Sequence, residues 1–211
     1  GGQGPIAPSA LALTDHFDRV AVVDSVSKRY SACGARVGCI VTRNAELYEV
    51  ALKFAQARLS PPTVDQHAAL AALSAPQAEM HAAVNEYRQR RDVLVAGLNA
   101  IDGVYCPNPA GAFYMIVDLP VADAEAFCIF LLEEFELDGE TLMLAPAEGF
   151  YATPGAGTNQ VRLAYVLGVE PLRRCLAILK AGLAAWQARS DTLPPGQSSS
   201  LFSSDVLRPS K

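Results

Sequence analysis

The sequence has little positive charge. It contains 17 lysine and arginine residues against 22 aspartate and glutamate residues, which gives a formal net charge of −5 at pH 7 and an isoelectric point near 5.2. No block rich in lysine and arginine interrupts this balance. Proteins that bind nucleic acids normally carry a basic excess that neutralises phosphate groups. We therefore expect no nucleic-acid partner.

Long apolar runs and paired cysteine motifs are also missing. No hydrophobic stretch approaches the roughly 20 residues that span a bilayer, and no charged leader precedes an apolar core at the amino end. The five cysteines form an odd set without C-x-x-C spacing, and the three histidines are not clustered. These patterns give no sign of a disulfide framework or a metal site. We expect a cytoplasmic protein with no membrane partner and no bound metal. The cysteines are Cys33, Cys39, Cys106, Cys128 and Cys175.

Hydrophobic residues, in contrast, are abundant and recur with the spacing of both strands and helices. They make up 51% of the 211 residues, which is enough to fill the cores of one or two domains. Short β-branched runs predict buried strands, and apolar residues three or four positions apart predict amphipathic helices. Strands are predicted at 20–23, 38–42, 113–117, 142–145 and 160–165, and helices at 45–59, 63–73, 76–100 and 124–135, with a final helix from Pro171.

A polar segment follows the first predicted strand directly. It carries hydroxyls at Ser25 and Ser27, an amine at Lys28, a guanidinium at Arg36 and a glycine at Gly38. Open α/β sheets bind ligands at the carboxyl ends of their strands. Hydroxyls and a guanidinium suit a phosphate, while a lysine in such a site can lose its proton and attack a carbonyl. Lys28 or Arg36 alone is more typical of a solvated surface charge, but together the residues predict a site for a phosphorylated aldehyde.

Three separated motifs carry a resemblance to a known family. The run SVSKRYSACGARVGC at 25–39 resembles the pyridoxal-phosphate lysine motif of the fold-type I aminotransferases of classes I and II, and more narrowly their aspartate-aminotransferase-like members. The run GAFY at 111–114 resembles the family's small-domain strand. The run VRLA at 161–164 resembles the strand that bears the arginine for the substrate carboxylate. The motifs occur in the family's order, and the likeness covers residues 15–189.

The resemblance implies a cofactor, pyridoxal 5′-phosphate, and a set of site residues. Lys28 would be the catalytic lysine that holds the cofactor as a Schiff base, and Ser25, Ser27 and Arg36 would bind its phosphate. Arg162 would clamp the substrate carboxylate, a task that suits the planar fork of a guanidinium. The alternative for Arg162 is an edge-strand arginine that points to water. Tyr151, in a segment rich in turn formers, is predicted to be a surface residue.

The resemblance also implies an α/β fold in which the C-terminal part of the large cofactor-binding domain precedes the small α+β domain. We expect a flexible lead-in at 1–13, the end of the large domain at 14–75, the small C-terminal domain at 76–189 and a disordered tail at 190–211. The family's glycine-containing phosphate loop, its ring-stacking aromatic residue and its aspartate for the ring nitrogen have no room in the 27 residues before Lys28. The sequence therefore predicts the carboxyl-terminal portion of an enzyme that is inactive, or nearly so, in isolation.

Three functions agree with these features. The first is a transaminase that forms a homodimer and transfers an amino group between an aspartate-like amino acid and a 2-oxo acid. The second is another pyridoxal-phosphate reaction on the same fold, such as a lyase or decarboxylase reaction, because a fold does not fix its chemistry. The third is a noncatalytic interaction fragment that keeps the fold without the complete site.

Overall fold

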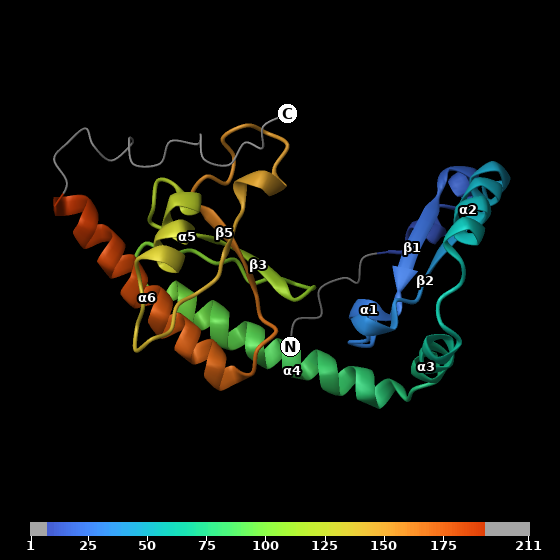
Figure 1. Ribbon diagram of the computed structural model, residues 1–211, viewed down its shortest axis with the longest axis horizontal. Helices are drawn as coiled ribbons and strands as arrows, with labels where there is room; N and C mark the ends of the chain where they lie inside the picture. Colours follow the sequence, from blue (N-terminus) through green and yellow to red (C-terminus); the bar gives the residue numbers. More distant parts are fainter. Residues whose placement is uncertain (1–7, 193–211) are drawn as a thin grey trace. The chain divides into compact units, whose positions relative to one another are not determined.

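The computed structural model describes residues 8–192, which form two compact units (Figure 1). Unit 1 ends at Ala83 and unit 2 begins at Val84, so the division falls inside helix α4 (Gln77–Asn99). The sequence analysis predicts a boundary between the family's large and small domains after residue 75. That boundary stays a prediction. Residues 1–7 of the predicted lead-in and 193–211 of the predicted tail lie outside the described residues. Within the remainder, Ala10–Ala12 form a short 3-10 helix and 190–192 belong to helix α6 (Val169–Thr192).

Unit 1 is built on two antiparallel strands, β1 (Ala21–Ser25) and β2 (Gly38–Thr42). The connection between them contains the short helix α1 (Val26–Arg29), so the polar segment that follows the first strand is helical where it carries Lys28. Helices α2 (Ala45–Arg58) and α3 (Thr63–Leu73) follow. Asn44 caps α2, because its Oδ1 accepts a hydrogen bond of 2.8 Å from the Leu47 N–H. The break between α2 and α3 falls at the two prolines, as the sequence predicts.

The prediction that β1 and β2 are buried is wrong for the described chain. Val23 on β1 is 77% exposed and Ile40 on β2 is also exposed. Phe54 on α2 is 74% exposed. The physical reason is that, among the described residues, this sheet has only two strands. A two-stranded sheet with so few neighbours leaves apolar side chains without a surface against which to pack.

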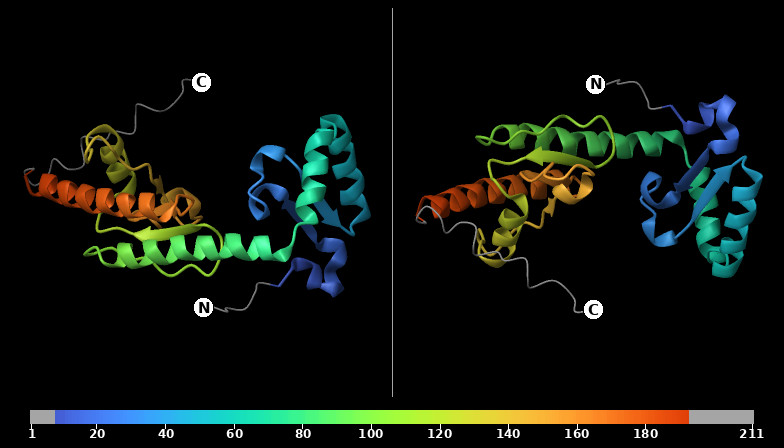
Figure 2. Two further views of the ribbon diagram at one scale, coloured as in Figure 1. Left: turned by 90° about the horizontal axis from the view of Figure 1, so that it is seen from below. Right: turned by 90° about the horizontal axis from the view of Figure 1, so that it is seen from above.

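Unit 2 contains a three-stranded antiparallel sheet in the order β3 (Tyr114–Asp118), β5 (Gln160–Ala164), β4 (Ala145–Pro146). Helices α4, α5 (Ala124–Glu133) and α6 accompany it. The strand predicted at 142–145 is reduced to its last residue plus Pro146, because Leu142 and Leu144 pack against the core and do not pair with β5. Figure 2 shows α4 and α6 side by side, and Gly97 allows this approach: a Cβ there would lie 2.2 Å from the Leu176 side chain.

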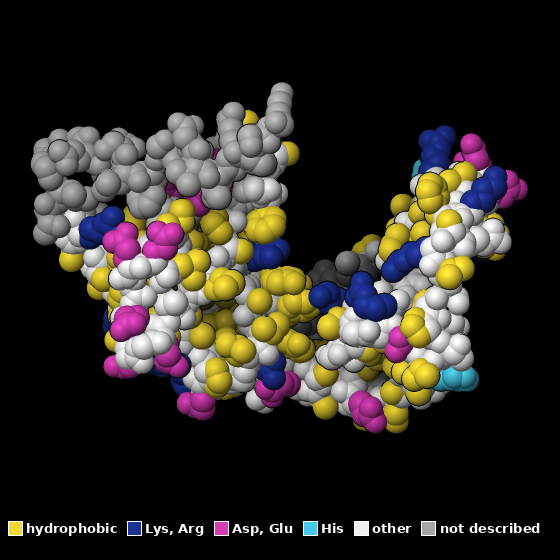
Figure 3. All heavy atoms as spheres, viewed as in Figure 1, with side chains coloured by type: hydrophobic (Ala, Val, Ile, Leu, Met, Phe, Trp, Pro, Cys, Tyr) yellow, Lys and Arg dark blue, Asp and Glu magenta, His cyan; other side chains and the backbone are white. Residues whose placement is uncertain are grey.

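The core lies in unit 2, on one face of its sheet. Met115 and Val117 on β3 and Val161 on β5 are buried, while the residues between them are only partly covered. This alternation is the period-2 pattern of a strand with one buried face, and it places Arg162 on the opposite face from Val161. Leucines and phenylalanines of α4, α5 and α6 complete the core. Figure 3 shows hydrophobic side chains at the surface of both units. No helix within residues 8–192 is long and apolar enough to cross a membrane.

Candidate functional site

The turn that carries Lys28 is anchored at its start by Ser25 and Val26. Ser25 ends β1 and caps α1, and its Oγ accepts a hydrogen bond of 3.3 Å from the Ser27 N–H. The Val26 side chain is buried, and its N–H donates to the Val37 carbonyl at 3.2 Å. These bonds tie the two ends of the connection together. Lys28 is therefore exposed on a short helical turn whose first residues are fixed against the sheet.

Arg36 lies where the connection returns to the sheet. Its backbone is left-handed, with φ 53° and ψ 33°, and its Nη1 donates a hydrogen bond of 2.8 Å to the Cys33 carbonyl. Gly38, two residues later, pairs with Ser25 in the strand register. A Cβ on Gly38 would lie 2.8 Å from the Asp24 carbonyl oxygen, so a side chain does not fit there. The missing side chain at Gly38 brings the Arg36 segment close to Ser25.

Three of the predicted site residues share one hollow in unit 1. Ser25, Ser27 and Arg36 line a space of about 1080 Å³ together with Gly38, whereas Lys28 is not among its lining residues. The nearby charges of Asp24 and Arg29 pair with each other at 2.7 Å. The rest of the lining comes mainly from apolar residues of β2 and α2. Within it, the Ser25 and Ser27 hydroxyls and the Arg36 guanidinium are donors that fit the phosphate end of a cofactor. The part of the chain that the structure describes contains no cluster of three or more histidine, cysteine or acidic residues placed to hold a metal ion.

Arg162 lies in unit 2, where its guanidinium contacts two aromatic rings. Its Cζ is 4.7 Å from the centre of the Tyr114 ring and 4.5 Å from the centre of the Phe150 ring. Tyr114 is two residues from Ile116, the partner of Arg162 in the β3–β5 register, and this diagonal position lets the side chains meet. Among the described residues, the guanidinium forms no hydrogen bond or ion pair. The rings stabilise the cation through cation–π contacts, while its N–H groups suit a planar carboxylate.

The segment that carries Phe150 is fixed to the sheet by a chain of hydrogen bonds. Phe150 ends the 3-10 helix η4 (Glu148–Phe150), and the next residue, Tyr151, donates from its hydroxyl to the Gln160 Oε1 at 2.5 Å. The Gln160 Nε2 in turn donates to the Asp118 Oδ1 at 2.5 Å. Gly157, with φ 76°, passes under the Tyr151 ring, where a Cβ would lie 2.4 Å from a ring carbon. Tyr151, predicted as a surface residue, is exposed but also holds this segment.

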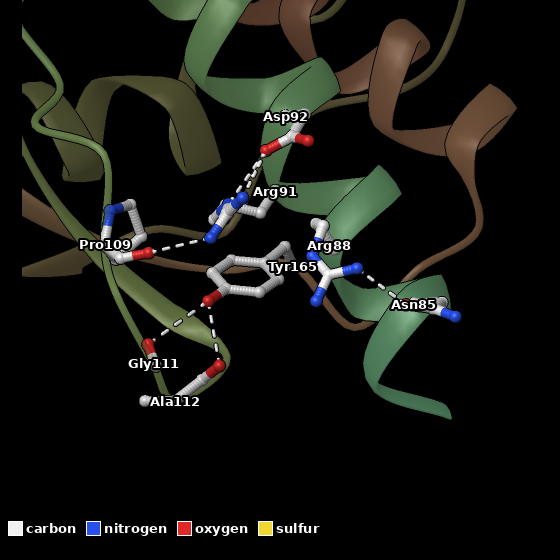
Figure 4. A network of polar contacts seen from close by, with 8 residues as sticks. All are labelled: Asn85, Arg88, Arg91, Asp92, Pro109, Gly111, Ala112 and Tyr165. Carbon is white, nitrogen blue, oxygen red and sulfur yellow. Dashed lines mark hydrogen bonds and ion pairs between the residues drawn. The ribbon is translucent and has the colours of Figure 1, made fainter. Parts of the chain in front are cut away.

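A second network fixes the start of β3, which carries Tyr114 (Figure 4). The buried Tyr165 hydroxyl donates to the Ala112 carbonyl at 2.8 Å and lies 3.4 Å from the Gly111 carbonyl. Burial raises the pKa of Tyr165, which keeps the phenol protonated as the donor. Arg91 of α4 donates to the Pro109 carbonyl at 3.2 Å. Tyr165, which follows β5, thus fixes the first residues of the GAFY run, and Arg91 of α4 fixes the chain just before it.

The structure brings together part of the predicted site. Ser25, Ser27 and Arg36 share one hollow, while Arg162 is described within the other unit. Sequence reasoning missed the two rings that hold Arg162. The GAFY run signalled Tyr114 as part of a strand, but its contact with Arg162 depends on the β3–β5 register. No sequence pattern pointed to Phe150 as a neighbour of Arg162, because Phe150 lies in a segment rich in turn formers that has no regular spacing.

A family model, curated relatives and solved structures all support the family that the sequence motifs resemble. Residues 1–138 match the family model for class I and II aminotransferases. The chain is 31% identical over 177 residues to an aspartate/prephenate aminotransferase of Cereibacter sphaeroides, a match over 78% of this chain and 42% of that protein. It is 29% identical over 176 residues to an aspartate aminotransferase of Rhizobium meliloti, with 78% and 40% covered.

A solved structure shares the fold. The crystal structure of an aspartate aminotransferase from Rhizobium meliloti superposes with a TM-score of 0.74 at 26% sequence identity, over 87% of this chain and 46% of that one. The chain therefore spans between 40% and 46% of the length of these three relatives. The fold-type I class expected from the motifs is confirmed, as is a mixed α/β fold that represents part of the relatives' structure.

Proposed function

This chain belongs to the class I and II aminotransferase family, and on that premise we propose that it supplies the cofactor lysine and the carboxylate-binding arginine of a transaminase. The reaction transfers an amino group between an aspartate-like amino acid and a 2-oxo acid. The observation that supports it most directly is the shared hollow of Ser25, Ser27 and Arg36 beside the turn that carries Lys28. Two hydroxyls and a guanidinium are donors that suit the phosphate of such a cofactor.

Pyridoxal 5′-phosphate is the cofactor that fits these residues. When bound, it supplies a ring that accepts electrons from a bond broken at the substrate Cα. The Ser25 and Ser27 hydroxyls and the Arg36 guanidinium would hold the phosphate through charge-assisted hydrogen bonds. Lys28 would hold the cofactor through its amine. Once the substrate amine has taken its place, the freed amine of Lys28 would take the proton from the substrate Cα and return it, as general base and then as general acid.

Arg162 orients the substrate through its carboxylate. Two parallel N–H donors fix both oxygens of the carboxylate and so fix the direction of the Cα–H bond. The Tyr114 and Phe150 rings both contact the guanidinium carbon, and its N–H groups are the part that binds the carboxylate. The rings also restrict the side chain before substrate arrives, which lowers the ordering cost of binding.

We also propose a homodimer that works in the cytoplasm. Unit 1 exposes large apolar side chains such as Val23 and Phe54, which a second subunit or further chain can cover. All five cysteines are free, as expected in a reducing compartment. The mass of the native protein in solution, measured by light scattering, tests the dimer; a monomeric native protein would contradict it.

Borohydride trapping tests the role of Lys28. The chain is saturated with pyridoxal 5′-phosphate, reduced with borohydride and mapped by peptide mass spectrometry. We expect the label on Lys28, its loss in Lys28→Ala and its retention in Lys53→Ala, a matched change of an exposed lysine on α2. Saturated protein without a label on Lys28 would refute the assignment. Product analysis of the native protein with aspartate and 2-oxoglutarate then separates amino transfer from a lyase or decarboxylase reaction.

A further inference from the structure

Gln160 lies on the same face of the unit 2 sheet as Arg162. Both residues are on β5, and Val161 between them is fully buried. Side chains two positions apart on a strand share a face. The strand partner of Gln160 is Asp118 on β3, and that of Arg162 is Ile116. The Gln160 side chain is therefore a near neighbour of the proposed carboxylate clamp, although the proposed chemistry gives it no task.

Gln160 holds the segment 147–157 at three points. Its backbone carbonyl accepts a hydrogen bond of 2.9 Å from the Ala147 N–H, and its own N–H donates to the Gly157 carbonyl at 3.0 Å. Between these two ends, its side-chain Oε1 accepts a hydrogen bond of 2.5 Å from the Tyr151 hydroxyl. One residue of β5 thus closes the segment and also fixes its middle.

The side-chain amide of Gln160 has a defined orientation. Its Nε2 donates to the Asp118 Oδ1 at 2.5 Å. Because a carboxylate only accepts hydrogen bonds, the amide nitrogen must face Asp118 and the amide oxygen must face Tyr151. Asp118 belongs to β3, which pairs with β5 along its full length. The sheet therefore orients the amide, and the amide orients Tyr151.

Tyr151 determines where the neighbouring Phe150 ring lies. The centre of the Phe150 ring is 4.5 Å from the Arg162 Cζ, although Phe150 is 56% exposed, so burial alone does not fix the ring. The other ring that contacts Arg162, that of Tyr114, belongs to β3 and is fixed by the strand pairing. The contact of Phe150 with the guanidinium therefore depends on the hydrogen bond between Gln160 and Tyr151.

We propose that Gln160 is a positioning residue for the Arg162 guanidinium and acts through Tyr151 and Phe150. While its amide holds Tyr151, the Phe150 ring restricts the guanidinium before a carboxylate arrives. A side chain that is restricted in advance loses less freedom on binding, which strengthens binding by about three- to tenfold. This inference rests on the role of Arg162 in the proposed function.

Binding of butanedioate to the complete 211-residue chain tests the proposal without cofactor or turnover. NMR of ¹⁵N-arginine-labelled protein follows the Nε–H signal of Arg162, which is identified by its loss in Arg162→Gln. We expect Gln160→Leu to weaken binding about three- to tenfold, because the guanidinium is no longer restricted. Gln89→Leu, at an exposed glutamine of α4, is the control and should bind normally. Equal affinities in Gln160→Leu and the unaltered chain would overturn the proposal.

The Arg162 signal also reports the position of the guanidinium directly. Loss of the Phe150 ring current should move this signal in Gln160→Leu toward the position typical of a solvent-exposed arginine. A purely structural role of Gln160 would lower stability and leave the signal of the folded protein unchanged. Phe150→Leu should cause the same movement, and the double variant should show no further change, because both residues act on one path. A further movement in the double variant would contradict that path.

A tyrosine pair repeats the test without a change to the strand. Tyr151→Phe removes the hydroxyl that Gln160 accepts from and should weaken butanedioate binding about threefold. Tyr105→Phe, at an exposed tyrosine of the same unit, is the control and should have no effect. Normal binding in Tyr151→Phe would overturn the proposal.

Arg162→Gln distinguishes this inference from the proposed function. It should abolish butanedioate binding, because the clamp itself is gone. Retained binding in Arg162→Gln, or no binding by the unaltered chain, would reject the clamp and the positioning role together. Loss of binding in Arg162→Gln combined with normal binding in Gln160→Leu would reject the positioning role alone.

Discussion

The two units use similar sequence patterns and bury them to very different extents. Among the described residues, the buried hydrophobic side chains of unit 1 are Val26 and Ala69, whereas unit 2 has a continuous core from Leu94 to Leu183. Unit 2 covers one face of its sheet with helices. Unit 1 has two strands and α2 beside them, and Val23 and Phe54 stay in water. An apolar run thus becomes core only where a second layer covers it.

This contrast has a consequence for the site. The hollow that we propose for a phosphate lies in unit 1, and the arginine that we propose for a carboxylate lies in unit 2. Arg162 is held by strands and rings whose positions follow from a packed core. Ser25, Ser27 and Arg36 are held by local hydrogen bonds and by the close approach at Gly38. We therefore expect the surroundings of Arg162 in unit 2 to stay folded at urea concentrations at which the Ser25–Arg36 hollow of unit 1 is already lost.

The largest expected effect comes from paired phenylalanine truncations. Phe127 on α5 is 0% exposed, and Phe127→Ala should lower the free energy of unfolding of unit 2 by about 3–5 kcal/mol through lost burial and an internal cavity. Phe54→Ala on α2, where the ring is 74% exposed, should change stability by less than about 0.5 kcal/mol. Urea unfolding followed by circular dichroism measures both. Similar losses in the two variants would show that unit 1 is covered in solution.

A pair of glycine substitutions tests the packing under the phosphate hollow. Gly38→Ala places a methyl group 2.8 Å from the Asp24 carbonyl oxygen, which must push the strands apart at Ser25. We expect a loss of about 1–3 kcal/mol in the stability of unit 1 and weaker binding of pyridoxal 5′-phosphate, measured by its absorbance change. Gly34→Ala is the control, because nothing lies within 4 Å of a Cβ there. Unchanged cofactor binding in Gly38→Ala would separate the hollow from the cofactor.

The hydrogen bonds of Tyr165 give a smaller effect in unit 2. Tyr165→Phe removes the donor to the Ala112 carbonyl and leaves the buried ring in place. The stability of unit 2 should fall by about 1–2 kcal/mol, because a partly buried acceptor loses its partner. Tyr105→Phe, at an exposed tyrosine, should be neutral. Thermal melting of both variants provides the comparison; equal melting temperatures for the two would argue against a role for this network.

The pH dependence tests the burial of two cysteine thiols in unit 2. Burial, with help from Asp118, raises the pKa of Cys106 from 9.0 to about 11, and burial raises that of Cys128 from 9.0 to about 11, with Glu125 and Asp123 adding to the effect. Because the folded pKa values exceed the unfolded ones, the neutral thiols stabilise unit 2 fully below pH 9, and this contribution is lost as the pH rises through 11. Urea midpoints at pH 8 and 10.5 measure the loss. Cys106→Ala and Cys128→Ala together should flatten the difference, and an unchanged slope would contradict the assignment.

The sequence by itself determined the local features and the family. The cap at Asn44, the start of α3 at Thr63, the proline-terminated α2 and the helix that begins before Pro171 follow from residues that interact with near neighbours in the chain. The serine–lysine run is also local, since Ser25, Ser27 and Lys28 lie on one turn whose cap forms within it. Such features depend on few contacts, and a single chain segment contains all of them.

Only the tertiary structure decided burial, register and the surroundings of Arg162. A β-branched run has the same pattern whether or not a layer covers it, so the sequence could not reveal that Val23 is exposed in the described chain. The strand predicted at 142–145 is shorter in the structure because Leu142 and Leu144 pack against the core of unit 2. Arg162 meets Tyr114 across a strand pair and Phe150 across a turn. These contacts join residues far apart in the chain, and their energy depends on surfaces that exist only once the whole unit has packed.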